Sequence, residues 1–138
     1  MFEKRHKVYK LPTLTQGAAM DATQAATATI SYDDFAKLDL RVATVREAQP
    51  IEKSKKLIKM QIELAGGEMR QILAGIKEHY AAEQLVGRQI IVVANLAPRE
   101  VIKGETSYGM LLAAHDAQSG KVVIMGPTEP VSPGSKVS

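Results

Sequence analysis

The sequence predicts an all-β fold: a five-stranded Greek-key barrel with a short helix between the third and fourth strands and a C-terminal strand extension. Two observations predict it. Apolar residues recur in stretches of strand length from residue 38 onward, and one run of helix formers at 77–86 separates the third stretch from the fourth. The chain of 138 residues, 45% of them hydrophobic, is long enough to bury a core. A small β-sandwich without an internal helix is the alternative, and the run at 77–86 argues against it.

The first 29 residues differ in composition from the rest. They begin with basic residues, and the stretch 13–29 consists mostly of Thr, Ala, Gln and Gly. Such a stretch buries too little apolar surface to offset the entropy lost on ordering. We therefore predict a disordered tail or linker over 1–29 and a folded domain over 30–138.

The domain is predicted to open with one helical turn and a bent strand. The segment Ser31–Asp34 has the pattern of a capping box, and the turn is expected to end near Lys37. The segment Leu38–Val42 then alternates, with Leu38, Leu40 and Val42 on one face. The parity shifts at Ala43 and Val45, which indicates a bulge or a strong bend.

A hairpin is predicted next. Segment 57–64 alternates between the inward residues Ile58, Met60, Ile62 and Leu64 and the outward residues Lys59, Gln61 and Glu63. Gly66-Gly67 is a turn signal, and the returning strand is expected over Met69–Ile76.

The second half is predicted to hold the helix and the remaining strands. The helix covers Lys77–Val86 and is closed by Gly87, and a central strand buried on both faces covers Arg88–Leu96. A loop containing Pro98 and Gly104 leads to a strand at 109–114, and the turn 115–120 leads to an additional strand at 121–126. This order of elements is the plan of an OB-type barrel.

Charge and composition exclude several classes of protein. The net charge is +3, of which residues 1–29 carry +2 and the domain +1, so a polyanion site in the domain must be a local cluster. The chain has no cysteine, its three histidines are isolated, and no nucleophile or phosphate-loop motif occurs. We expect no catalysis, no cofactor and no metal site, no membrane contact, and a cytoplasmic protein.

Two clusters of polar residues remain as candidate binding sites. The first is the loop Lys53-Ser54-Lys55-Lys56, with Lys59 and Arg41 on the flanking strands. OB barrels commonly hold oligonucleotides at this loop, although a lysine-rich tip also serves solubility. The second runs from Asn95 to Met110 and includes Arg99, Lys103 and Ser107. Long polar loops on rigid sheets tend to carry function, the alternative being an irregular connection fixed by Pro98 and Gly104.

Aromatic residues are scarce, at 4% of the chain. Generic single-strand binders use several stacking platforms. The scarcity favours a folded RNA recognised through phosphate, ribose and shape, with one or two stacked bases.

Several ordered blocks resemble the tRNA-binding domain family, which includes the C-terminal domain of bacterial methionyl-tRNA synthetases and free-standing tRNA-binding proteins. The blocks, which span about residues 30–138, are Asp33–Val42, Lys55–Leu57, Gln71–Ile76, Gly87-Arg88, Val93–Arg99 and Ser107–Ala113. The resemblance implies an OB-fold dimer that binds tRNA without catalysis and raises the tRNA affinity of a synthetase core. It also implies tRNA contacts in the first inter-strand loop and at Ser107, Gly109 and Met110, while Asn95 and Arg99 match a further family block.

The chain departs from the family at Lys55, where members often carry an acidic residue. The charge of this loop is therefore expected to differ. A secretion-chaperone branch of the family shares the fold and binds peptides, and it supplies the alternative function.

A homodimer is predicted from the apolar run Val122–Met125. It follows the five strands of the barrel, and an additional apolar strand requires cover on both faces.

Overall fold

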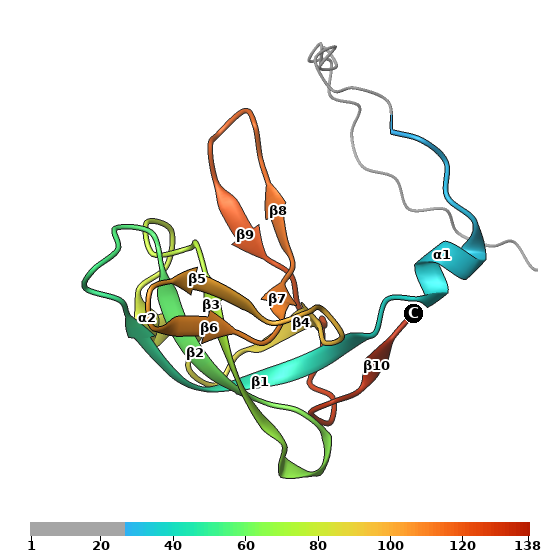
Figure 1. Ribbon diagram of the computed structural model, residues 1–138, viewed down its shortest axis with the longest axis horizontal. Helices are drawn as coiled ribbons and strands as arrows, with labels where there is room; N and C mark the ends of the chain where they lie inside the picture. Colours follow the sequence, from blue (N-terminus) through green and yellow to red (C-terminus); the bar gives the residue numbers. More distant parts are fainter. Residues whose placement is uncertain (1–26) are drawn as a thin grey trace, which may run out of the picture. The chain divides into compact units, whose positions relative to one another are not determined.

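The computed structural model describes residues 27–138, and the folded body starts at Ser31 (Figure 1). Nearly all of the predicted linker at 1–29 lies outside the described residues. Within 27–138, no helix has the length and apolar character needed to cross a bilayer.

The body opens with α1 (Tyr32–Ala36), which has the predicted capping box. The Ser31 hydroxyl accepts a hydrogen bond from the Asp34 amide at 3.1 Å, and the Asp34 carboxylate accepts one from the Ser31 amide at 3.4 Å. Leu38, predicted to share one strand face with Leu40 and Val42, is instead 43% exposed, whereas the other two are buried. The reason is that β1 begins only at Leu40, so Leu38 lies in the connection before the strand.

The long strand β1 (Leu40–Pro50) organises the barrel. It pairs with β4 over residues 40–44 and with β2 over residues 44–50, and its register shifts between Val45 and Glu47. The predicted bulge is confirmed and lies just past the parity change in the sequence. Ala43 and Val45 belong to the core cluster, whereas Val42 is bonded through its backbone to the C-terminal segment. Residues on both faces of the strand are therefore buried.

The hairpin of β2 (Ile58–Glu63) and β3 (Met69–Ala74) follows the predicted pattern. The four predicted inward residues at 58, 60, 62 and 64 are buried in the core cluster. Gly66 and Gly67 have φ values of 68° and 79°, a conformation that glycine adopts without steric cost, and they make the turn.

The helix is much shorter than predicted: α2 covers only Ala82–Leu85. The preceding residues are held by tertiary contacts that compete with helix formation. The Lys77 ammonium donates to the carbonyl oxygens of Ile51 and Ser54, and the Tyr80 hydroxyl accepts from the Ile124 amide at 3.1 Å. Local helix propensity is a weak preference and yields to such contacts.

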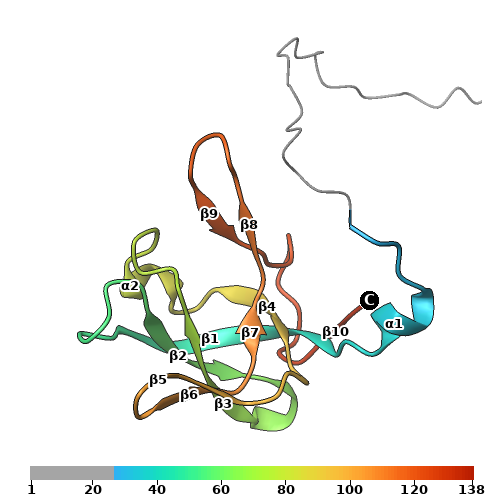
Figure 2. The same ribbon diagram turned by 45° about the horizontal axis from the view of Figure 1, so that its top comes forward.

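The strand β4 (Gln89–Val93) lies between β1 and β7 (Met110–Leu111), so it is the predicted central strand, shortened at both ends. The main sheet has the order β3-β2-β1-β4-β7, and residues 107–109 run beside the edge of β3. Figures 1 and 2 show the sheet curling around the core. With α2 between the third and fourth strands, this is the predicted OB-type barrel.

Two features of the second half differ from the prediction. The predicted loop after β4 contains a hairpin, β5 (Arg99–Ile102) and β6 (Glu105–Ser107). The two residues of β10 (Lys136–Val137) pair with the start of β1. The predicted additional strand is confirmed as β9 (Val122–Ile124), which pairs with β8 (Ala113–His115) in a hairpin that projects from the barrel (Figure 2).

Candidate nucleic-acid interface

The loop between β1 and β2 presents three lysines to solvent. Lys53, Lys55 and Lys56 are exposed, and their side chains form no ion pair with any residue of 27–138. The Ser54 hydroxyl instead accepts hydrogen bonds from the amides of Lys56 and Leu57, at 3.1 and 3.2 Å. Ser54 therefore shapes the turn that carries the lysines.

Lys77, which was predicted to lie on a helix, holds this loop through three hydrogen bonds. Its ammonium donates to the carbonyl oxygens of Ile51 at 2.9 Å and Ser54 at 2.8 Å, and its amide donates to the carbonyl of Lys56 at 3.0 Å. Charged hydrogen bonds of this kind are stronger than neutral ones. The loop is thus pre-ordered, and no local signal in the sequence indicates that Lys77 is responsible.

The β5–β6 hairpin folds over the outer face of β2 and β3. The Lys59 ammonium lies 3.3 Å from the Glu105 carboxylate, and the side-chain Nε2 of Gln71 donates to the Thr106 carbonyl at 2.9 Å. The tip of the hairpin, which carries Lys103, therefore lies beside the lysine loop, as Figures 1 and 2 also show. Lys59 is consequently paired within the protein rather than free for a ligand.

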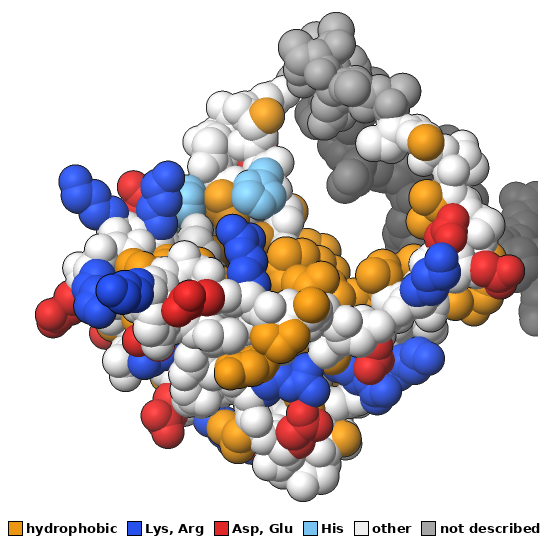
Figure 3. All heavy atoms as spheres, viewed as in Figure 1, with side chains coloured by type: hydrophobic (Ala, Val, Ile, Leu, Met, Phe, Trp, Pro, Cys, Tyr) orange, Lys and Arg blue, Asp and Glu red, His pale blue; other side chains and the backbone are white. Residues whose placement is uncertain are grey.

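The loop and the hairpin together form a patch of positive charge, which we call the basic sector. Its charged residues are Lys53, Lys55, Lys56, Lys59, Arg99 and Lys103, with Glu52, Glu100 and Glu105. Six basic and three acidic residues give +3, whereas the remainder of 31–138 has eight basic and ten acidic residues, a net of −2. In Figure 3, Lys and Arg side chains lie over the loop end of the barrel at the left, and others lie at the lower right. The domain is nearly neutral as a whole but strongly asymmetric.

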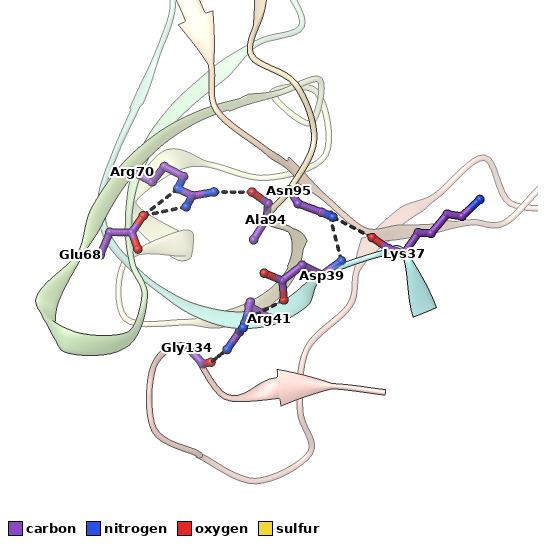
Figure 4. A network of polar contacts seen from close by, with 8 residues as sticks. All are labelled: Lys37, Asp39, Arg41, Glu68, Arg70, Ala94, Asn95 and Gly134. Carbon is purple, nitrogen blue, oxygen red and sulfur yellow. Dashed lines mark hydrogen bonds and ion pairs between the residues drawn. The ribbon is translucent and has the colours of Figure 1, made fainter. Parts of the chain in front are cut away.

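Two of the predicted site residues, Arg41 and Asn95, serve the fold (Figure 4). The Arg41 guanidinium pairs with Asp39 at 2.6 Å and donates to the Gly134 carbonyl at 3.1 Å. The Asn95 side chain accepts from the Asp39 amide at 2.8 Å and donates to the Lys37 carbonyl at 2.7 Å. These contacts fix the start of β1 against the C-terminal segment and the end of β4.

Ser107 is also committed to the fold. It is only 5% exposed, and its hydroxyl accepts from the Leu73 amide at 2.9 Å and donates to the Gly109 carbonyl at 2.8 Å. The Tyr108 amide donates to the Gln71 carbonyl. This bond and those of the Ser107 hydroxyl provide partners for backbone groups at the edge of β3. Gly109 has φ of 151°, and a Cβ there would lie 3.1 Å from the Val93 carbonyl oxygen, so glycine is required at this close approach.

Arg99 and Met110, by contrast, share an open hollow of about 480 Å³ beside the lysine loop. Both side chains are exposed, and Leu57, Val101 and His115 complete the rim. Both residues belong to the second predicted cluster, Asn95 to Met110, and Leu57 places this hollow next to the end of the lysine loop. A cation over an apolar floor suits a phosphate next to a sugar or base, and it also suits an apolar peptide side chain.

No three His, Asp or Glu side chains come together within 27–138 in a way that would hold a metal ion. One carboxyl group has a shifted pKa: the hydrogen bond from the Ser119 hydroxyl lowers the pKa of Asp116. Asp116 lies in the turn between β8 and β9, outside the basic sector.

Residues 40–136 match the family model described as "Putative tRNA binding domain". The chain belongs to the tRNA-binding domain family. This tRNA-binding domain is 50% identical over 98 residues to a methionine–tRNA ligase of Chlorobium luteolum, a match that covers 71% of the chain and 14% of the ligase. A methionine–tRNA ligase of Archaeoglobus fulgidus is 41% identical over 137 residues, 99% of the chain and 20% of that ligase. The chain therefore spans a fifth or less of these relatives.

Two solved structures resemble the tRNA-binding domain in fold and sequence. A MetRS-related protein from Pyrococcus horikoshii has a TM-score of 0.74 and 35% identity, and the match covers 81% of this chain and all of that one. The chaperone CsaA from Bacillus anthracis has a TM-score of 0.71 and 32% identity, and the match covers 80% of this chain and all of that one. The relationship to both branches expected from the sequence is confirmed.

Proposed function

We propose that the chain is a non-catalytic tRNA-binding module and that the basic sector is its contact surface. The observation that carries this proposal is the pre-ordered lysine loop beside Arg99 and Lys103, in a body that is otherwise net negative. Lysine and arginine side chains neutralise phosphates, and these contacts position an RNA without reading its bases. Affinity should therefore differ little among tRNA species.

The revised contact set is smaller than the sequence predicted. We propose Lys53, Lys55, Lys56, Arg99, Lys103 and Met110 as contacts, because all six are exposed around the loop and the hairpin. Because of their internal hydrogen bonds, we propose that Ser54 and Ser107 shape these segments. For the same reason, we propose that Arg41 and Asn95 stabilise the ends of the barrel.

The names of the relatives support a role beside a methionyl-tRNA synthetase core, whose tRNA affinity the module would raise. We also propose a cytoplasmic homodimer. The exposed apolar side chains of Val123 and Met125 on the projecting β8–β9 hairpin supply the surface for self-association.

Peptide binding is the second candidate function. The likeness to a chaperone and the apolar floor of the hollow beside Arg99 support it. A peptide held by apolar contacts would bind with little dependence on salt, whereas tRNA binding should weaken steeply as counterions compete for phosphate.

The decisive experiment is a titration of labelled tRNA at several salt concentrations. Changing Lys53, Lys55 and Lys56 together to alanine should weaken binding and flatten the slope of log affinity against log salt by up to about 2–3 units, since roughly 0.7–0.9 counterions are released for each phosphate neutralised. The matched control changes three exposed lysines outside the sector to alanine, Lys37, Lys121 and Lys136, with the same loss of charge. Its effect should be much smaller.

Equal losses in the two triple variants would show that only net charge matters and would remove the basic sector from the proposal. A slope near zero for the unmodified chain, together with salt-independent binding of an apolar peptide, would favour the chaperone function.

A further inference from the structure

Three of the four aromatic side chains of residues 31–138 have an aromatic or cationic partner in the fold. The rings of Tyr32 and Phe35 lie 6.5 Å apart in α1. Tyr80 lies under the Arg88 guanidinium at 5.4 Å, and its hydroxyl accepts a hydrogen bond from the Ile124 amide. Tyr108 remains: its side chain is 45% exposed and makes no hydrogen bond within 27–138.

Tyr108 borders a shallow hollow of about 480 Å³ between the start of β3 and the base of the β5–β6 hairpin, separate from the one that holds Met110. Its walls are Met69, Leu96 and Pro98, and two of these side chains, Met69 and Leu96, are nearly half exposed. Arg70 closes one side, and its guanidinium is held by Glu68 at 2.7 Å and reaches the Tyr108 carbonyl at 3.4 Å. The backbone on either side of Tyr108 is fixed as well, through Ser107 and Gly109.

We propose that this hollow is a subsite for one unpaired nucleobase, which stacks on the Tyr108 ring. The inference rests on the proposed function, because the base belongs to the RNA that the basic sector holds. Any base offers a π-face to a tyrosine, so the subsite recognises an unstacked nucleotide rather than a particular base. One platform, in place of the several that single-strand binders use, fits an RNA that is folded except at one loop or end.

The position of the hollow favours a nucleotide over an apolar protein segment. Arg70 lines the hollow beside Tyr108, and its guanidinium is paired with Glu68 at 2.7 Å. The phosphate of a nucleotide stacked on the Tyr108 ring would lie close to this cation and compete with Glu68 for it. An apolar segment would gain nothing from the cation and would bury it together with its carboxylate, which costs the desolvation of both charges.

Tryptophan fluorescence provides a direct test, because the chain has no tryptophan. Tyr108→Trp places a single reporter in the hollow, and Tyr32→Trp places one at an exposed tyrosine in α1 as the matched control. We expect tRNA to quench the emission of Y108W and to leave Y32W unchanged. A fully paired RNA duplex without loops should bind through the lysines but leave Y108W unquenched.

Affinity measurements with a second set of variants make the test independent of the reporter. Tyr108→Leu should weaken tRNA binding about five- to tenfold without changing the salt slope, and Tyr108→Phe and Tyr32→Leu should bind like the parent. Thermal melting verifies that each variant is folded.

Two failures can be told apart. If the unmodified chain binds tRNA with a steep salt slope but Y108W is not quenched and Y108L binds normally, the subsite is wrong and the proposed function stands. If the unmodified chain does not bind tRNA, the proposed function fails. If Y108W emission shifts to the blue with an apolar peptide and does not respond to tRNA, the proposed nucleobase subsite is wrong and the hollow binds a protein ligand.

Discussion

At the scale of single residues, Ser107 shows how a residue expected to contact RNA can instead stabilise the fold. Its buried hydroxyl takes the place of a strand neighbour for the Leu73 amide at the edge of β3. Removing it leaves a buried donor without a partner, which costs more than the net worth of one hydrogen bond.

We predict that Ser107→Ala lowers the free energy of unfolding by about 1–3 kcal/mol, the cost of an unsatisfied buried polar group. Urea unfolding measures it. Ser119→Ala is the control, because both hydrogen bonds of its hydroxyl, to the Asp116 carboxylate and from the Lys121 amide, are exposed, and the change there should stay within about 0.5 kcal/mol. A variant S107A that unfolds like the parent yet loses tRNA affinity would instead make Ser107 a direct contact.

The sequence predicts which residue types have the chemistry to bind RNA, but it does not show their hydrogen-bond partners in the fold. The exposed positions of Lys53, Lys55 and Lys56 could be predicted because a short loop between two strands has few ways to bury a lysine. Arg41 and Asn95 have equally suitable chemistry for RNA, but apart from the local pair of Arg41 with Asp39 their hydrogen-bond partners lie 93 and 56–58 residues away in the chain. No local pattern can show such contacts.

At the scale of elements, the β5–β6 hairpin is the part of the site that sequence patterns missed. Its strands have four and three residues, and they lack the apolar alternation that identifies β2 and β3. The hairpin is stabilised mainly by its contacts with the face beneath it. The same dependence on distant contacts explains why α2 is shorter than its helix formers suggest.

The ion pair of Lys59 with Glu105 holds the hairpin and also neutralises one cation of the basic sector. Both side chains are only about a quarter exposed or less, at 21% and 25%. Glu105→Gln should free Lys59, raise tRNA affinity and steepen the salt slope by up to about 0.7–0.9 units.

The matched control for this prediction is Glu63→Gln, which removes the carboxylate paired with Arg46 at the opposite end of β2 from Lys59. It changes the net charge by the same amount outside the sector, so its effect on the slope should be small. If E63Q and E105Q strengthened tRNA binding equally, the gain would come from net charge alone, and the position of Lys59 in the basic sector would not matter. A lower affinity of E105Q would show that the hairpin position matters more than the added charge.

At the scale of the whole molecule, the net charge does not reveal how unevenly the charges are distributed. A body with +3 on one sector and −2 elsewhere orients toward a polyanion, although its total charge is close to zero. Composition alone could not show this, because the asymmetry arises when folding brings the β1–β2 loop next to a hairpin some fifty residues further along the chain.

The last prediction concerns assembly. Val123 on β9 is 46% exposed on a hairpin that projects from the barrel, and Met125 beyond it is 43% exposed. If this surface joins two copies, Val123→Lys should convert a dimer into monomers in sedimentation at micromolar concentration, because a buried ammonium without a partner is costly. Val131→Lys is the control, since Val131 is 42% exposed, lies outside the hairpin and adds the same charge. Two linked basic sectors bind one tRNA more tightly than a single sector does, so V123K should also lose affinity while V131K retains it. A parent chain that sediments as a monomer, or a dimer that V123K leaves intact, would show that β9 is not the interface.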